Sequence, residues 1–249
     1  MKRTLYLLAA LLIFMPACKK KEKETGCTTI DSVCILKLRH RAGPSAFAFN
    51  SDYTDDFGNQ FQFTRADFYL KVDGFLEHDN LTVTIGDDLY ALVSPTIGEI
   101  NYGVVPEGTL HNLDWAIGVD SALNHADLSI YEAGHALSHQ SPSMHWGWSS
   151  GYIFCVMEGI VDVDGSGTYD PGENFALHVG MDPQFRDGTN IHVETPVTPG
   201  DTAFVNIDVD YLEFVDSIDL SIDNSTHTMD NMPLAVRVAD NFPKVLKMP

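Results

Sequence analysis

The feature that most constrains this sequence is a long apolar run that leads directly into an acidic loop. The run, YIFCVMEGIV at residues 152–161, is rich in aromatic and β-branched residues, which favour strands. Other apolar segments are short, alternate with polar residues and end at turn residues, with no strand-helix-strand rhythm. The sequence therefore predicts an all-β protein, an antiparallel β-sandwich with long loops.

The acidic loop after this run has the spacing of a calcium-binding loop. Gly167 stands at its sixth position, where the chain must turn sharply. Oxygen-bearing side chains fill positions 1, 3, 5, 7, 9 and 12: Asp162, Asp164, Ser166, Thr168, Asp170 and Glu173. Such residues also favour surface turns without a metal, which is the alternative. Because an apolar strand precedes the loop, we expect an inserted calcium site on a β-connection and not an EF-hand.

The N-terminus predicts export. Residues 1–17 begin with Lys2 and Arg3, continue with a short apolar run and end in small residues before Cys18. We interpret 1–17 as a signal peptide that resembles a bacterial lipoprotein signal, Cys18 as the lipidated residue, 18–31 as a tether and 32–249 as one β domain. The expected location is the periplasm, the outer membrane or the cell surface. A plain secretory signal is the alternative.

The net charge limits which partners the protein can bind, and the cysteines limit which disulfide it can form. The formal net charge is −20, and removal of residues 1–17 makes it −22. Nucleic acid is therefore excluded as a partner, and we expect membrane contact only through the lipid anchor. An exported compartment permits disulfides, and Cys27 with Cys34 is the sequence-close pair that we expect to form one. Cys155 lies in the apolar run and is interpreted as a core residue.

Histidines and tryptophans are the remaining chemistry-bearing residues. In residues 33–41 the alternation puts His40 on the same strand face as Leu36 and Leu38, where a histidine is usually a hydrogen-bonded core residue. Trp146 and Trp148 are two residues apart, so we expect them on one strand face with Tyr152, as a functional pair or simply as an aromatic patch. The histidines between 122 and 143 have no fixed spacing and are interpreted as surface residues: His125, His135 and His139.

Four segments together resemble a known family. They are FTRADFYLKVDGF at 63–75, VPEGTLHNLDWAIGVDS at 105–121, MHWGWSSGYIFCVMEG at 144–159 and FALHVG at 175–180. In this order they resemble the MbnP-like family, which includes the methanobactin-associated proteins and the copper-binding CorA and MopE proteins of methanotrophs. The resemblance covers residues 33–242.

The resemblance implies an exported copper-binding β-sandwich protein that is not an enzyme and that serves copper acquisition, storage or delivery. In relatives of this family a tryptophan is oxidised to kynurenine by a MauG-like dihaem peroxidase, and histidines hold Cu(I) beside it; Cu(II) is the other state to consider. Trp146 and Trp148 match the tryptophan motif. The histidines expected at the copper site are His40 and His178, with His145 and His227 as further candidates. The alternative function is a calcium-stabilised β-sandwich interaction module with no copper role.

Overall fold

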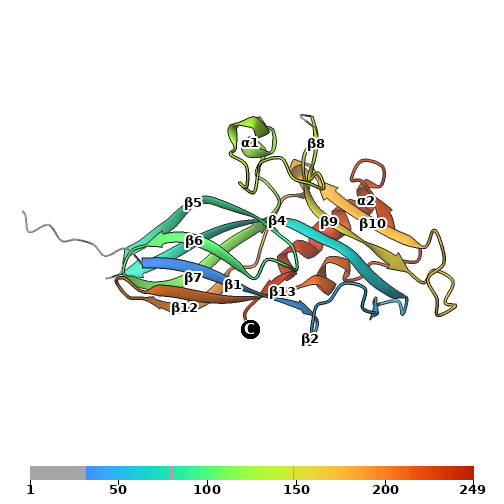
Figure 1. Cartoon of the computed structure of the whole chain (residues 1–249), viewed down its shortest axis with the longest axis horizontal. Helices are drawn as coiled ribbons and strands as arrows, with labels where there is room; N and C mark the ends of the chain where they lie inside the picture. The colour runs from blue at the N-terminus through green and yellow to red at the C-terminus, as the bar shows by residue number, and fades with distance from the viewer. Residues whose placement is uncertain (1–31, 79–80, 148) are drawn as a thin grey trace, which may run out of the picture.

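The computed structural model describes residues 32–78, 81–147 and 149–249 and shows a mostly β protein with two sheets (Figure 1). The strands are β1 (Ser32–Ala42), β2 (Ser45–Ala46), β3 (Tyr53–Thr54), β4 (Gln60–His78), β5 (Leu81–Val93), β6 (Glu99–Val105), β7 (Gly108–Ile117), β8 (His145–Gly147), β9 (Gly151–Val161), β10 (Asn174–Gly180), β11 (Arg186–Asp187), β12 (Ile191–Val197), β13 (Thr202–Asp210), β14 (Ser225–Thr226) and β15 (Leu246–Lys247). The α-helices are α1 (Ser121–Asn124) and α2 (Met232–Asn241). Short 3₁₀ turns cover Leu128–Ile130, Asp182–Gln184, Tyr211–Val215 and Phe242–Lys244.

The smaller sheet is built around β1. On one edge β1 pairs in parallel with β13, and it also pairs in antiparallel with β6 and β2. A parallel pair cannot be joined by a hairpin and needs a long connection, and here most of the larger sheet lies between β1 and β13 in sequence. The prediction of a purely antiparallel sandwich is therefore wrong in this respect: the sheets are mixed.

The larger sheet is built around the long strand β4. It pairs in antiparallel with β5, β7 and β9, and β9 continues into a hairpin with β10. The short strand β14 then pairs in parallel with β10. The predicted strand at 152–161 is confirmed as β9, and the acidic loop joins it to β10, so strands flank the loop on both sides as expected.

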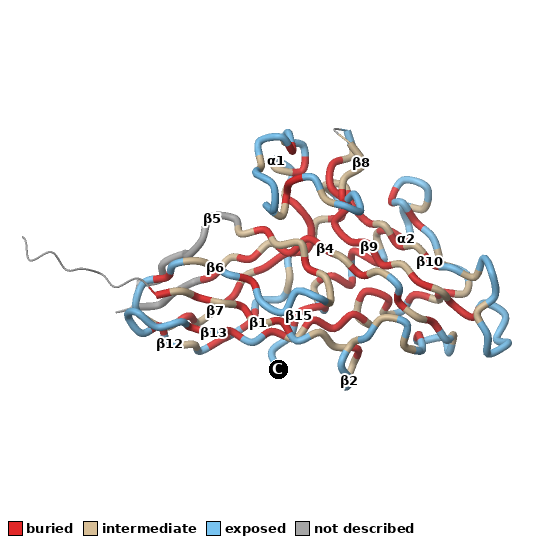
Figure 2. Tube along the Cα trace, viewed as in Figure 1, coloured by how far each residue is buried: buried red, intermediate tan, exposed pale blue. Residues whose placement is uncertain are grey.

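The main core is formed by apolar side chains from both sheets (Figure 2). On β9 and β10, period-two alternation directs Cys155, Met157, Leu177 and Val179 into this core. A second, smaller core covers the opposite face of β9 and packs under the loops between α1 and β8. Its buried members are Tyr69, Tyr90, Val119, Leu128, Leu137, Met144, Tyr152, Ile153, Phe154 and Val156.

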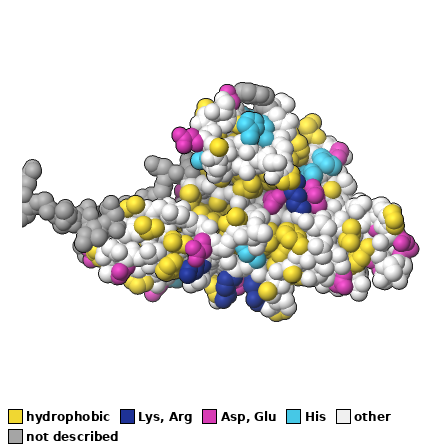
Figure 3. All heavy atoms as spheres, viewed as in Figure 1, with side chains coloured by type: hydrophobic (Ala, Val, Ile, Leu, Met, Phe, Trp, Pro, Cys, Tyr) yellow, Lys and Arg dark blue, Asp and Glu magenta, His cyan; other side chains and the backbone are white. Residues whose placement is uncertain are grey.

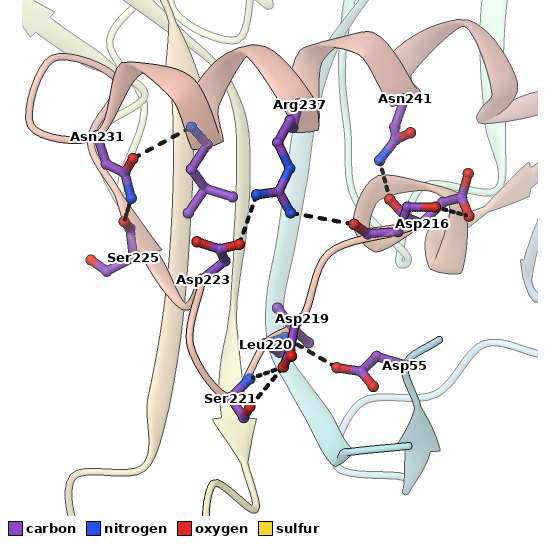
Figure 4. Close-up of polar contacts among 12 residues, drawn as sticks. Asp55, Asp216, Asp219, Leu220, Ser221, Asp223, Ser225, Asn231, Arg237 and Asn241 are labelled. Atoms are coloured by element: carbon purple, nitrogen blue, oxygen red, sulfur yellow. Dashed lines mark hydrogen bonds and ion pairs between the residues drawn. The ribbon is translucent and has the colours of Figure 1, made fainter. Parts of the chain in front are cut away.

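The C-terminal helix α2 packs against β10 and β14. Pro at its start suits the first turn, where no backbone N–H is needed, and Asn231 caps it by accepting a hydrogen bond from the Leu234 N–H. The Asn231 amide also donates to the Ser225 carbonyl, and Arg237 forms an ion pair with Asp223 (Figure 4). These contacts tie the helix to the segment before β14.

Several predicted features lie outside the described residues. These are the signal peptide at 1–17, the tether at 18–31 with Cys18 and Cys27, and Trp148. Cys34 is a buried free thiol whose pKa is raised to about 11 by burial, and its pairing with Cys27 stays a prediction. No helix among the described residues is long and apolar enough to span a membrane.

Gly159 allows β4 and β9 to approach closely. A Cβ at this position would lie 1.9 Å from the Gln62 carbonyl oxygen and 2.4 Å from the Phe175 ring. We expect Gly159→Ala to lower the free energy of unfolding by about 1–3 kcal/mol or more, because the core must shift to admit the methyl group. Gly98→Ala is the matched control, since a Cβ there meets no atom within 4 Å, and it should change stability by less than about 0.5 kcal/mol. Denaturant unfolding measures both, and equal stabilities for the two variants would contradict the packing.

Candidate metal centre

His178 projects from the outer face of β10, away from the main core. Its neighbours Leu177 and Val179 are fully buried in that core, so alternation turns His178 the other way. The β10–β14 register pairs Leu177 with Thr226, and the residues that follow are His178 and His227. Parallel pairing therefore brings these two histidines to the same face, although 49 residues separate them in sequence.

The two imidazoles contact each other and each is held by a carboxylate. Their ring centroids lie 4.7 Å apart, with the rings nearly perpendicular. Nε2 of His178 lies 2.7 Å from a Glu158 oxygen, and Nδ1 of His227 lies 3.2 Å from an Asp230 oxygen. Because a carboxylate accepts hydrogen bonds, we assign the proton to Nε2 of His178 and to Nδ1 of His227. Each ring then keeps one nitrogen lone pair for a metal, in the carboxylate-histidine arrangement common at metal sites.

The surroundings of His178 lower the pKa of its imidazole. Burial lowers the pKa of its imidazole, Glu158 opposes this effect, and the neighbouring His227 and Arg65 lower the pKa further. The side chain is only 16% exposed. Because a metal ligand must be deprotonated, a lowered pKa means that protons compete with a metal only in more acidic solution.

Arg65 links this site to the adjacent strand. Its guanidinium lies 2.7 Å from Asp67 and 3.6 Å from Glu158, and it donates a hydrogen bond to the Met144 sulfur. Figure 3 shows basic and acidic side chains next to each other, with histidine nearby, on the face below the loops that carry α1. Glu158 therefore accepts a hydrogen bond from His178 and forms an ion pair with Arg65, which restricts its orientation.

Trp146 lies on the same face of β10. A Cβ added to Gly180 would lie 2.8 Å from the Trp146 ring, so the indole rests on the backbone two residues beyond His178. Only glycine leaves room for this contact. The expected single strand that would carry Trp146 and Tyr152 is wrong, because they belong to the paired strands β8 and β9.

The fold does not place His40 near His178. It faces the main core, as the alternation predicted, and both its ring nitrogens have partners: the Tyr211 hydroxyl at 3.0 Å and the Ile97 carbonyl at 2.8 Å. The main core and the larger sheet lie between it and the outer face of β10. This is the environment of a hydrogen-bonded core histidine.

Neither ring nitrogen of His145 has a free lone pair for a metal in this arrangement. Its Nδ1 accepts a hydrogen bond from the Gly147 N–H at 2.9 Å, so the neutral ring carries its proton on Nε2. That Nε2 is buried and has no hydrogen-bond partner within the described part of the chain. His145 lines a cavity of about 360 Å³ with His139, Asp127 and Trp146. In this arrangement it offers a hydrogen-bond donor and no lone pair at Nε2.

The acidic loop brings three of its six predicted ligands together. Carboxylate oxygens of Asp162, Asp164 and Glu173 lie within 4.8 Å of one another. The two Glu173 oxygens accept from the N–H groups of Val163 and Asp170, which ties the beginning of the loop to its end. Ser166 lies next to this group, because its backbone N–H donates to the Asp162 and Asp164 carboxylates. The fourth predicted carboxylate ligand, Asp170, is not part of the group.

Sequence reasoning missed the carboxylates that hold the histidines. The sequence pattern could have indicated Glu158, because it is the single charged residue in the apolar run 152–161. No sequence pattern could have indicated Asp230, since its role depends on how the turn after β14 folds back on His227.

Glu158 should control the proton affinity of His178. Because its carboxylate raises the pKa of that imidazole, Glu158→Gln should lower the pKa below its already lowered value. NMR titration of the His178 ring measures this. Glu194→Gln, near the exposed His192 on β12, is the control and should leave the pKa of His178 unchanged. A pKa that rises in Glu158→Gln would contradict the assigned contact.

Comparison with known proteins agrees with this architecture. Residues 32–231 match the model of the MbnP family. Among solved structures, MbnP from Methylosinus trichosporium is similar with a TM-score of 0.52 and 14% sequence identity, over 79% of this chain and 81% of that chain, a likeness that shows the fold alone. A comparison with curated proteins found no match. Since the matched segment spans most of the chain, the protein belongs to the MbnP family.

Proposed function

We propose that this protein is an exported copper-binding protein that acquires, stores or delivers copper, and that it is not an enzyme. Family membership supports a copper-related role. The observation that carries the proposal is the pair of His178 and His227, whose rings lie 4.7 Å apart and are each held by a carboxylate. Copper is the cargo of this site.

The donor set fits copper. Imidazole nitrogen is a good ligand for copper in proteins, and a pair of imidazoles suits the monovalent ion. The two cysteines among the described residues are buried in or near the main core and do not belong to the site: Cys34 and Cys155. Export would place the site away from the cytosolic thiols that compete for Cu(I).

Trp146 is the residue that we propose for oxidation to kynurenine. Its indole rests on Gly180, beside the strand residue His178, so a modified ring would remain next to the copper site. The proposed partner for this modification is a MauG-like dihaem peroxidase. Lipidation at Cys18 would keep the protein on a membrane of the cell envelope.

We also propose that the acidic loop holds a structural Ca²⁺. Three convergent carboxylates on a strand-flanked hairpin loop support this, because an oxygen-rich site at this spacing suits a hard cation. If copper did not bind, this site would favour the alternative function, a calcium-stabilised interaction module.

Substitution of the histidine pair tests the copper site. His178→Ala and His227→Ala should each lower Cu(I) affinity by at least about tenfold, because one of two imidazole ligands is lost. Competition with a chromophoric Cu(I) chelator measures the affinity. His192→Ala, at an exposed position on β12, is the control and should bind as the unaltered protein does. Unchanged affinity in both site variants would refute the proposed ligands.

Substitution of Glu173 tests the calcium site. Glu173→Gln removes one charge from the carboxylate group, so the rise in melting temperature on adding Ca²⁺ should become smaller than in the unaltered protein. Glu194→Gln is a matched exposed control that should retain the full rise. Thermal unfolding with Ca²⁺ or with a chelator gives both values, and a melting temperature insensitive to Ca²⁺ in every protein would exclude the site.

A further inference from the structure

Thr228, next to His227, has an unusual combination of properties. It is fully buried, and its φ of 64° lies in the left-handed region, which a β-branched residue rarely occupies. Such a conformation is strained and persists only where the surrounding contacts impose it. Glycine would adopt this conformation without strain, so the threonine side chain needs another explanation.

The hydroxyl of Thr228 bridges the turn to the strand that carries His178. It donates to the His178 carbonyl at 3.1 Å and accepts from the Gly180 N–H at 3.0 Å. The backbone pairing of β14 with β10 ends at Thr226, two residues earlier. The hydroxyl therefore replaces the backbone partners that β10 loses where β14 turns away.

Backbone pairing with β10 holds the start of the turn at Ser225 and Thr226, and the other hydrogen bonds of the turn lie within it. The Thr226 hydroxyl accepts from the Thr228 N–H and donates to the Asn231 carbonyl. The Asn231 amide reaches the Ser225 carbonyl, as Figure 4 shows. Asp230 accepts from the His227 N–H. All of these lie within residues 225–231, so the Thr228 bridge is the contact that connects the middle of the turn to His178.

We infer that Thr228 is a positioning residue of the copper site, whose hydroxyl holds His227 against His178. This inference rests on the proposed function and adds to it the element that assembles the ligand pair. The strained backbone is retained because it aims the hydroxyl at β10 while His227 faces outward. Without the hydroxyl, the turn would be free to move and the second imidazole would leave the site.

Three variants of Thr228 in the full mature chain test the inference with Cu(I) alone. Thr228→Val keeps the shape and removes the hydrogen bonds, and Thr228→Gly removes the bridge and relieves the strain, which protects the fold if the valine variant is unstable. Both should lower Cu(I) affinity by about tenfold or more, the usual effect of losing a residue that orients a ligand. Thr228→Ser retains the hydroxyl and should bind within about threefold of the unaltered protein.

X-ray absorption of the Cu(I)-loaded variants gives a second readout that a general loss of stability would not produce. The number of imidazole ligands should fall from two to one in Thr228→Gly and stay at two in Thr228→Ser. Unchanged affinity in both Thr228→Val and Thr228→Gly would overturn the inference, as would equal loss in all three variants. His178→Ala in the same series separates the two claims: if it loses copper while the Thr228 variants do not, only the positioning role fails, and if it retains copper, the proposed site itself fails.

Discussion

The alternation of side chains along β10 is the constraint on which the rest of the site depends. Leu177 and Val179 must enter the main core, and this turns His178 outward and leaves Gly180 as a flat surface for an indole ring. A shift of the β9–β10 register by one residue would bury His178 and expose the leucine and the valine, so the core energetics that fix the sheet also fix the histidine. The site is therefore as rigid as the hairpin that presents it.

The carboxylates orient the two histidines of the proposed site. An isolated pair of histidines could rotate, but Glu158 and Asp230 each contact one ring nitrogen and restrict that rotation. Burial lowers the pKa of His178, and Arg65, which forms an ion pair with Glu158, lowers it further. The result is a pair of oriented imidazoles, formed by residues from two strands and one turn. The acidic loop lies at the far end of the same hairpin, so a bound Ca²⁺ would stabilise the strands that carry His178 and Glu158.

Local sequence patterns predicted much of this molecule. The apolar run at 152–161 became β9, and the inward face of His40 followed from its spacing to two leucines. The carboxylates of Asp162, Asp164 and Glu173 lie close together, while their role as calcium ligands stays a prediction. The parallel pairs β1–β13 and β10–β14 were not predicted, because pairing between distant segments leaves no periodic signal in either strand. For the same reason the sequence grouped His178 with His40 as expected ligands, whereas the histidine that contacts His178 in the structure is His227.

Metal analysis of the protein isolated from its native host tests the central claim most directly. The account predicts about one copper ion per chain, held in the folded protein and released on unfolding, together with calcium. Calcium without copper, in protein that has been offered Cu(I), would contradict it and would mean that this member of the family uses the fold without the metal cargo.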